Sequence, residues 1–464
     1  MNRGLTTVLL TGLAFATCPG WAADTLPMKK QGFFHAQKTD GCWWLIAPDG
    51  SRFISKGVTT VQFAQDHIQS TNISPYEDTN KTKYGGLQAW REAVARRLLG
   101  WGFNTLGAWS DEALSAIAVG DQRLAYAPTV NLGGSFVTRK DAWMHGIFPD
   151  VFDPAFAVQA RRQAMERCAG RKNDPWLLGW FTDNELRWGP DWRGKDELLT
   201  MFLALPPKSP GREAAVHLLQ NRYREVAAFN AVWRTGFSAW DALAQAGPIQ
   251  PPMVRQEVYA QNQETERHAN EADPKRAAFV ADCEAFVAEL AERYFRVTAE
   301  AIKAADPHHM NLGCRFAYFP PKSVALAAAK HLDAISFNCY DTDPRRVIGQ
   351  YAALGKPLII GEFSFRGDDS GLPNTKGAGP RVATQSDRAA AFRAYVTWAL
   401  GNANVVGYHW FEHADEPKEG RFDGENSNYG VVNIHDEVYG DLTGAMQEIN
   451  RKAEALHAAG ADSR

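Results

Sequence analysis

Two glutamates, each next to an apolar run of the sequence, could act together as a catalytic pair. Glu185 comes shortly after residues 177–181, and Glu362 ends the aliphatic run 358–360. A lone buried carboxylate after three aliphatic residues is costly, which favours a functional role over a structural one for Glu362. Two carboxyl groups about 5–5.5 Å apart can cleave a glycosidic bond with retention. We therefore expect Glu185 and Glu362 to form such a catalytic pair.

An Asn-Glu dipeptide alone carries little information in a chain of 464 residues. The pattern becomes specific only as a set of polar and aromatic residues that end predicted strands. The set comprises the segments WFTDNE (180–185), NCY (338–340), GEF (361–363) and HW (409–410).

Eight short apolar runs alternate with helical patterns along the chain. The predicted strands are 57–61, 104–109, 125–132, 177–181, 310–316, 334–340, 358–363 and 405–411. The intervening helices are expected at 87–99, 111–119, 156–171, 273–304, 347–354, 386–401 and 442–458. This alternation predicts an α/β fold, a (β/α)8 TIM barrel whose chemistry lies at the C-terminal ends of the strands.

Two further features complete the predicted domain. An N-terminal hairpin, 42–46 and 52–54, is expected around the turn signal PDG at 48–50. A long insertion, about 186–273, follows the fourth strand, and its tryptophans could roof the cleft or form a local core. We expect residues 23–464 to form a single catalytic domain.

Composition excludes some functional classes. The net charge of −3 gives no electrostatic reason to expect nucleic acid, and it fits a neutral substrate. No segment after the N-terminus has 18 uninterrupted apolar residues, so no membrane span is expected. There is no CxxC pair, and His409 and His413 lie on or beside a strand rather than on a helix, so neither a metal nor another cofactor is expected. The oligomeric state stays open.

The N-terminus has the pattern of a secretory signal peptide over residues 1–22. Arg3 precedes an apolar run at 5–16, and small residues flank Trp21. This predicts a secreted or periplasmic protein; lipidation at Cys18 is disfavoured because Thr17 precedes it. Removal of the signal leaves five of six cysteines. Cys314 and Cys339, on predicted neighbouring strands, could be bridged, but buried thiols are favoured.

These motifs resemble the clan of retaining (β/α)8 glycosidases and, more narrowly, the β-agarase family akin to β-galactosidases. The narrower resemblance covers most of residues 40–439. It rests on DGCWW (40–44), PDG (48–50), GFNT (102–105), WSD (109–111), DVFDP (150–154), FNAVW (229–233), AERYF (291–295), LGCRF (312–316), VGYHWF (406–411) and GRFDGEN (420–426). The agarases it resembles carry a large N-terminal β-rich domain, whereas this chain begins almost directly at the hairpin.

In that clan the acid/base follows an Asn on the fourth strand and the nucleophile ends the seventh, so the resemblance implies Glu185 as acid/base and Glu362 as nucleophile. It also implies roles for further residues. Asn184 should contact the sugar hydroxyl next to the reacting carbon, and Tyr340 should orient Glu362. Arg315 could bind substrate hydroxyls or pair with Glu362. The full set of expected substrate-binding residues is Asn184, Trp109, Arg315, Asn338, Tyr340, His409, Trp410, Glu425 and Asn426.

The expected substrate is a β-linked oligosaccharide or polysaccharide, first of the β-galactan or agarose type. The bulky insertion could close one end of the cleft, which favours exo action. Three alternatives remain: a transglycosylase, a β-glycosidase for another sugar such as a β-glucan, and a non-catalytic sugar-binding barrel. The presence of both carboxylates argues against the last of these.

Overall fold

The computed structural model describes residues 32–139, 141–250, 252 and 274–462. The predicted signal peptide, Cys18 and the end of the insertion therefore lie outside the described residues. Within the described ranges, no helix is long and apolar enough to cross a membrane.

A parallel sheet forms the centre of the fold. Its order is β6 (Ala125–Tyr126), β5 (Thr105–Leu106), β4 (Ser55–Val58), β14 (Val405–Trp410), β11 (Leu358–Phe363), β10 (Ile335–Asn338) and β9 (Phe316–Ala317). All these neighbours pair in parallel. A second parallel pair joins β7 (Gly179–Phe181) to β8 (Met310–Gly313). The α/β class with parallel strands is thus confirmed.

Single contacts join the pair β7–β8 to both edges of the larger sheet. Parallel bridges link Tyr126 to Leu177 and Thr129 to Phe181, on the β6 side. On the other side, the backbone N–H of Asp333, just before β10, donates to the carbonyl of Asn311 in β8 at 3.1 Å.

The predicted fifth strand, 310–316, is split into β8 and β9. Gly313, the last residue of β8, has φ 81° and Arg315 has φ 47°, and this left-handed backbone interrupts the extended conformation of a strand. The split turns the chain at the C-terminal end of β8. Cys314, within this turn, and Cys339 are both buried free thiols, so no disulfide joins them.

Long helices follow most strands. They are α2 (Leu87–Gly100), α3 (Pro154–Cys168), α9 (Pro274–Ala305), α10 (Lys322–His331), α11 (Arg345–Ala352), α12 (Gln385–Leu400) and α13 (Gly440–Asp462). In α2 the residues Trp90, Val94 and Leu98 recur at helical spacing and are fully buried. Apart from α10, which was not predicted, these helices match the predicted ones to within a few residues. The predicted helix 111–119 contains only the short 3-10 helix η1 (Glu112–Ala116).

Among the described residues outside the insertion, one further helix besides α10 was not predicted from the sequence. Helix α1 (Pro75–Tyr84) begins with Pro75, and the Ser74 side chain accepts a hydrogen bond from the backbone N–H of Glu77. Ser, Pro and an acidic third position form a standard start signal, so the information was present. The weak apolar pattern of α1 hid it.

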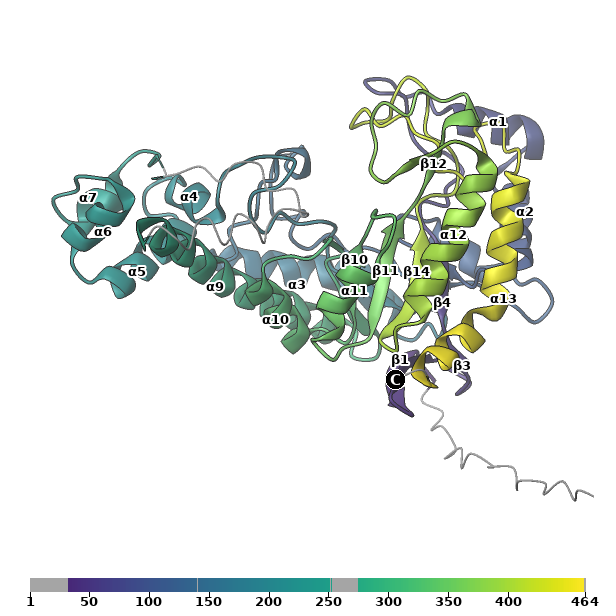
Figure 1. Cartoon of the computed structure of the whole chain (residues 1–464), viewed down its shortest axis with the longest axis horizontal. Helices are drawn as coiled ribbons and strands as arrows, with labels where there is room; N and C mark the ends of the chain where they lie inside the picture. The colour runs from purple at the N-terminus through teal and green to yellow at the C-terminus, as the bar shows by residue number, and fades with distance from the viewer. Residues whose placement is uncertain (1–31, 140, 251, 253–273, 463–464) are drawn as a thin grey trace, which may run out of the picture.

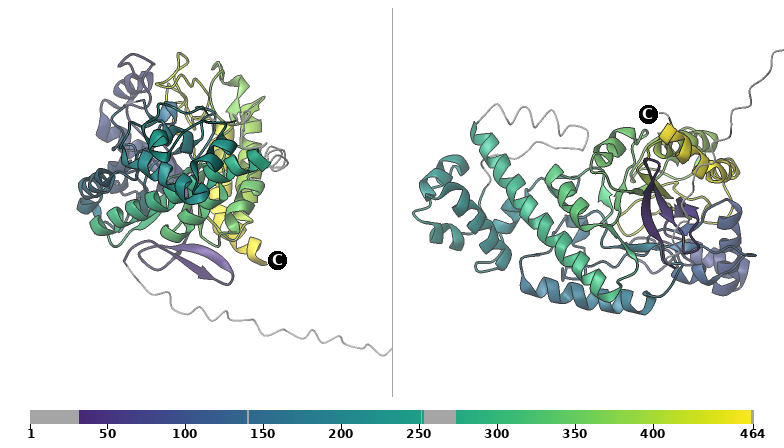
Figure 2. Two further views of the ribbon diagram at one scale, coloured as in Figure 1. Left: turned by 90° about the vertical axis from the view of Figure 1, so that its left-hand side faces the viewer. Right: turned by 90° about the horizontal axis from the view of Figure 1, so that it is seen from below.

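The N-terminal hairpin is a three-stranded antiparallel sheet rather than a two-stranded one. It contains β1 (His35–Thr39), β2 (Cys42–Ile46) and β3 (Arg52–Phe53). Trp43 donates its backbone N–H to Ala403 and its indole N–H to Gly355, in the segments that precede β14 and β11. The hairpin therefore packs at the N-terminal ends of the strands, and it lies below the body of the molecule in the left view of Figure 2.

The insertion after β7 folds as a helical lobe. Helices α4 (Leu198–Leu203), α5 (Pro210–Tyr223), α6 (Val226–Trp233) and α7 (Trp240–Gln245) gather with the first half of α9 and project to one side (Figure 1). Trp188 and Trp233 are buried, so both belong to local cores rather than to a roof. Trp192, by contrast, is 51% exposed.

Candidate active site

The residues after β7 are anchored by one buried carboxylate. Asp183 is 1% exposed and accepts hydrogen bonds from the backbone N–H groups of Gly133 and Gly134 and from the Tyr294 hydroxyl, at 2.6–3.0 Å. Burial raises its pKa to about 6, against the effect of these donors. Asp183 thus ties the end of β7 to a neighbouring loop and to α9.

Glu185 lies at the end of this anchored segment. Its backbone N–H donates to the carbonyl of Arg315 at 3.1 Å, and its φ of 46° lies in the left-handed region. Holding a non-glycine residue there costs about 1–3 kcal/mol, and such strain is concentrated at functional sites. The turn presents the Glu185 side chain at the C-terminal ends of the strands.

Glu362 is held by both of its carboxylate oxygens. Arg315 donates to Oε1 at 2.6 Å, and the Tyr340 hydroxyl donates to Oε2 at 2.7 Å. Arg315 is fully buried and also donates to the carbonyl of Gly361 at 3.0 Å. The sequence leaves two roles open for Arg315, binding of substrate hydroxyls or pairing with Glu362, and the structure contains the ion pair. The contact between Tyr340 and Glu362 that the resemblance implies is also present.

Asn338 connects the two glutamates. It pairs in register with Glu362 across β10 and β11, and its Nδ2 donates to Glu185 Oε1 at 2.8 Å and to Asn184 Oδ1 at 3.3 Å. Gly361 makes room for this arrangement, since a Cβ there would lie 2.8 Å from Asn338 Oδ1. The structure therefore brings Glu185, Asn184, Asn338 and Glu362 together.

The electrostatics of the two carboxyls differ. Burial, followed by the negative charge of Glu362, raises the pKa of Glu185 to about 7; the Asn338 hydrogen bond and the charges of Arg193 and Arg315 act in the opposite direction. Glu362 has the Arg315 guanidinium as a direct counter-charge. One carboxyl is thus set to hold a proton near neutral pH while its neighbour is paired as an anion.

Trp410 does not lie at this site. Consecutive strand residues point to opposite faces, and Trp410 points outward, packed on Phe363 and Phe392 at centroid distances of 5.4 and 5.9 Å. Its indole N–H donates to the carbonyl of Tyr429, and the side chain is fully buried. The expectation that Trp410 contacts a sugar is therefore corrected.

His409 faces inward but is enclosed. It is fully buried, Nε2 lies 2.9 Å from Ser55 Oγ, and Gly57 leaves the space that its ring fills. Burial and the charge of Arg315 lower its pKa to about 3, so the imidazole is neutral. His409 therefore packs between neighbouring strands and exposes no surface to which a sugar could bind.

The remaining expected residues lie on the rim. Trp109 is 36% exposed and covers the Arg315 guanidinium at 4.4 Å. Glu425 accepts from Arg421 at 2.8 Å, and Asn426 Oδ1 accepts from the backbone N–H groups of Thr375 and Lys376. Asn426 thus ties two loops together rather than pointing at the glutamates.

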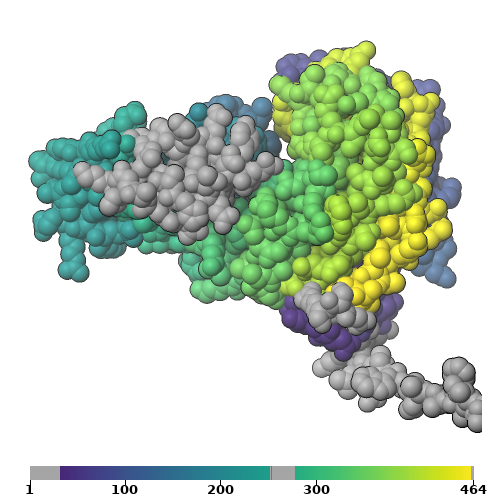
Figure 3. All heavy atoms as spheres, in the orientation of Figure 1, coloured from purple at the N-terminus to yellow at the C-terminus, as the bar shows by residue number. Residues whose placement is uncertain are grey.

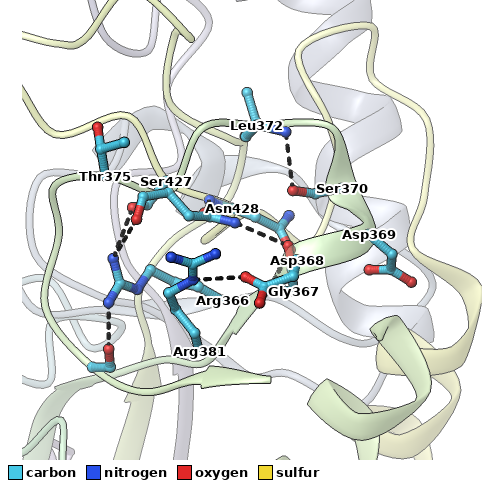
Figure 4. Close-up of polar contacts among 12 residues, drawn as sticks. Arg366, Gly367, Asp368, Asp369, Ser370, Leu372, Thr375, Arg381, Ser427 and Asn428 are labelled. Carbon is cyan, nitrogen blue, oxygen red and sulfur yellow. Dashed lines mark hydrogen bonds and ion pairs between the residues drawn. The ribbon is translucent and has the colours of Figure 1, made fainter. Parts of the chain in front are cut away.

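No local sequence pattern marked the segment that supports Tyr340. Strands β12 (Arg366–Gly367) and β13 (Arg381–Val382) form a small parallel pair after β11. Arg366 donates to the carbonyl of Gly379 at 2.7 Å and to Ser427, and the Gly367 N–H donates to Asn428 (Figure 4). A Cβ on Gly379 would lie 3.1 Å from Tyr340 Cδ1, so this loop packs directly on the Tyr340 ring.

In the space-filling view the surface is hollowed between two sets of segments (Figure 3). On one side are the light-green loop after β11 and the yellow loop after β14, and on the other side are the blue segments that precede β7. Among the residues with described positions, no group of three or more His, Cys, Asp or Glu side chains is arranged to hold a metal ion.

This chain is similar to known β-agarases over most of its length. β-Agarase B of Vibrio sp. (strain JT0107) is 28% identical over 94% of this chain and 50% of its own length. Among solved structures, PfGH50B superimposes with a TM-score of 0.76 at 26% identity, covering 94% of this chain and 68% of that one. This chain is β-agarase-like in sequence and fold.

A structure described as an exo-β-agarase gives a TM-score of 0.75 at 26% identity, covering 93% of this chain and 66% of that chain. This β-agarase-like chain spans about half the length of the curated relatives it matches, 50% and 46%. No family profile matches it.

The coupling between the two carboxyls can be measured directly. In Glu362→Gln the negative charge beside Glu185 is removed, so the pKa of Glu185 should fall from about 7 toward its ordinary value, with burial keeping it above that value. Carboxyl carbon NMR over a pH titration reads this pKa. Glu300→Gln, an exposed position on α9, is the matched control and should leave it unchanged. An unshifted pKa in Glu362→Gln would contradict the coupling.

Proposed function

We propose that this protein is a retaining glycoside hydrolase with Glu185 as acid/base and Glu362 as nucleophile. The observation that carries the proposal is the asymmetry of the two carboxyls. Glu362 is fixed at both oxygens by Arg315 and Tyr340, whereas the pKa of Glu185 is raised to about 7. A retaining mechanism needs one ionised, oriented carboxylate and one carboxyl that carries a proton.

The first step follows from this asymmetry. Glu362 attacks the anomeric carbon and forms an ester bond, while the Glu185 carboxyl gives its proton to the leaving glycosidic oxygen. Tyr340 and Arg315 keep the carboxylate of Glu362 in one orientation during the attack. Asn184, next to the acid/base, has its Oδ1 tied to Asn338 and its own amide hydrogens available for a sugar hydroxyl.

The second step reverses the role of Glu185. Ester formation removes the negative charge of Glu362, which is the second cause of the raised pKa of Glu185. The pKa of Glu185 therefore falls once the intermediate forms, and the carboxylate can take a proton from the water that attacks the anomeric carbon. The ester bond breaks, and the sugar leaves with its original configuration.

The proposal extends to the fold and the chain organisation. The strands β4, β5, β6, β7, β8, β10, β11 and β14 would close as a (β/α)8 barrel, supported by the bridges from β6 to β7 and the backbone contact from β8 to β10. Residues 23–464 would form one catalytic domain with its insertion at 186–273. Residues 1–22 would direct export to the periplasm or the medium.

The proposed substrate is a β-linked galactan or agarose-type oligosaccharide, cleaved from a chain end. The similarity to β-agarases and to an exo-β-agarase supports this choice. The near-neutral net charge suits an uncharged saccharide. The nearest alternative with the same two glutamates is a transglycosylase, in which a sugar rather than water accepts the glycosyl group.

Loss of the two glutamates should have different consequences. Glu185→Ala should lower kcat about 10²–10⁴-fold on substrates whose leaving group needs a proton, and much less on activated aryl glycosides. Azide should restore its rate, because an anionic nucleophile needs no general base. Glu362→Ala should abolish turnover on both kinds of substrate. Equal losses in Glu185→Ala on both, without azide rescue, would contradict the assignment.

Substrate and direction of attack are tested by products over time. Incubation with agaro-, galacto- and gluco-oligosaccharides should release small products from the ends of the galactose-containing chains, as seen by mass spectrometry. Early mid-chain fragments would contradict exo action. Activity confined to glucosides would contradict the galactan substrate, and longer products with an added acceptor would favour transglycosylation.

A further inference from the structure

One large aromatic side chain stands exposed on a rigid loop near the site. Phe422 is 59% exposed and lies in the loop 417–426 after β14. Backbone hydrogen bonds close this loop on itself: Gly420 to Pro417, Gly424 to Arg421 and Arg421 to Glu425, at 2.8–2.9 Å. The loop is therefore preformed around Phe422.

The Arg421 guanidinium forms a layer between two aromatic rings. Its central carbon lies 5.3 Å from the centroids of both Phe411 and Phe422. Its nitrogens pair with Glu416, Asp423 and Glu425 at 3.1, 3.0 and 2.8 Å. Three ion pairs and two stacking contacts fix Arg421, and through it the ring of Phe422.

This layer continues to the nucleophile. The Phe411 ring packs edge-to-face on Tyr340 at 6.2 Å, and Tyr340 donates to Glu362. Burial raises the pKa of Glu425, and the negative charges of Asp423 and, to a smaller extent, Glu362 raise it further. Phe422 therefore stands on the Glu362 side of the site, at the outer end of a continuous stack of side chains.

The other side of the loop is held as well. Gln69, in the segment between β4 and α1, donates its backbone N–H to the carbonyl of Gly420 at 2.9 Å and its amide to that of Phe422 at 3.4 Å. Single exposed aliphatic side chains such as Leu326 on α10 are normal on any surface. A rigid, exposed aromatic ring backed by a fixed cation is different, because its flat face is ready to bind without ordering cost.

We propose that Phe422 is a stacking platform for a neutral pyranose ring of the bound oligosaccharide, beyond the reacting sugar and on the nucleophile side of the cleft. The inference rests on the proposed glycosidase function. The apolar face of a pyranose packs on the aromatic ring, and the neighbouring Glu425 and Asp423 oxygens accept hydroxyl hydrogen bonds. Phe422 then determines the preference for longer chains rather than the chemistry of the bond.

Kinetics on a short and a long substrate separate these contributions. Phe422→Ala should raise KM for a soluble agaro-oligosaccharide of about six sugars roughly five- to tenfold, with kcat kept, and should change neither parameter on an aryl β-galactoside. Phe422→Trp should restore the KM, and Leu326→Ala is the matched control. Unchanged KM on the long substrate, or equal loss on both substrates, would overturn the proposal.

Binding without turnover distinguishes this inference from the proposed function. Calorimetric titration of Glu362→Gln, with and without Phe422→Ala, against the same oligosaccharide should show five- to tenfold weaker binding in the double variant. Such a difference in a protein whose wild type hydrolyses nothing would retain the platform and refute the glycosidase. Equal affinities, or no binding in either variant, would overturn the platform itself.

Discussion

The buried ion pair between Arg315 and Glu362 is the interaction on which the site depends. Both side chains lie almost wholly out of solvent, with Arg315 fully buried and Glu362 4% exposed. A buried charge without a partner is destabilising, so each residue offsets the cost of burying the other. The pair therefore constrains everything around it: the tyrosine on the second oxygen, the glycine that makes room at 361, and the aromatic faces of Trp109 and Phe181 over the guanidinium.

The second carboxyl acquires its properties from this pair. A left-handed turn and the buried Asp183 bring Glu185 to the C-terminal ends of the strands. Asn338, at the end of β10, donates a hydrogen bond to it. Its proton affinity depends on whether Glu362 is charged. A single bond to Glu362 would therefore switch Glu185 from acid to base, with no movement of the backbone required.

The sequence predicted the elements that carry chemistry because their signals are local. Glu185 and Glu362 each follow a short aliphatic or aromatic run, and the adjoining helices have clear apolar spacing. Local signals could not tell which way a side chain faces in a strand that is buried on both sides: all six residues of β14 are buried, so His409 and Trp410 looked alike. Only pairing with β4 and packing on α12 separates them.

Long-range contacts account for the other differences. The split between β8 and β9 depends on left-handed turns at Gly313 and Arg315, and an arginine gives no hint of such a turn. The loop of 366–382 is rich in Gly, Asp and Pro and reads as irregular, yet Arg366, Asn374 and Asn428 order it through contacts with residues some 50–60 positions away. That loop supports Tyr340, so part of the site is fixed by segments that no local pattern marks.

Covalent trapping tests the central claim most directly. A 2-deoxy-2-fluoro-β-galactosyl fluoride slows both steps but has a leaving group good enough to allow the first, so the glycosyl ester accumulates. Mass spectrometry of the digested protein should find one added fluorogalactosyl group, on the peptide that contains Glu362, and none in Glu362→Gln. A label on any other residue, or rapid hydrolysis of unmodified substrates to products of inverted configuration with no label, would contradict the account.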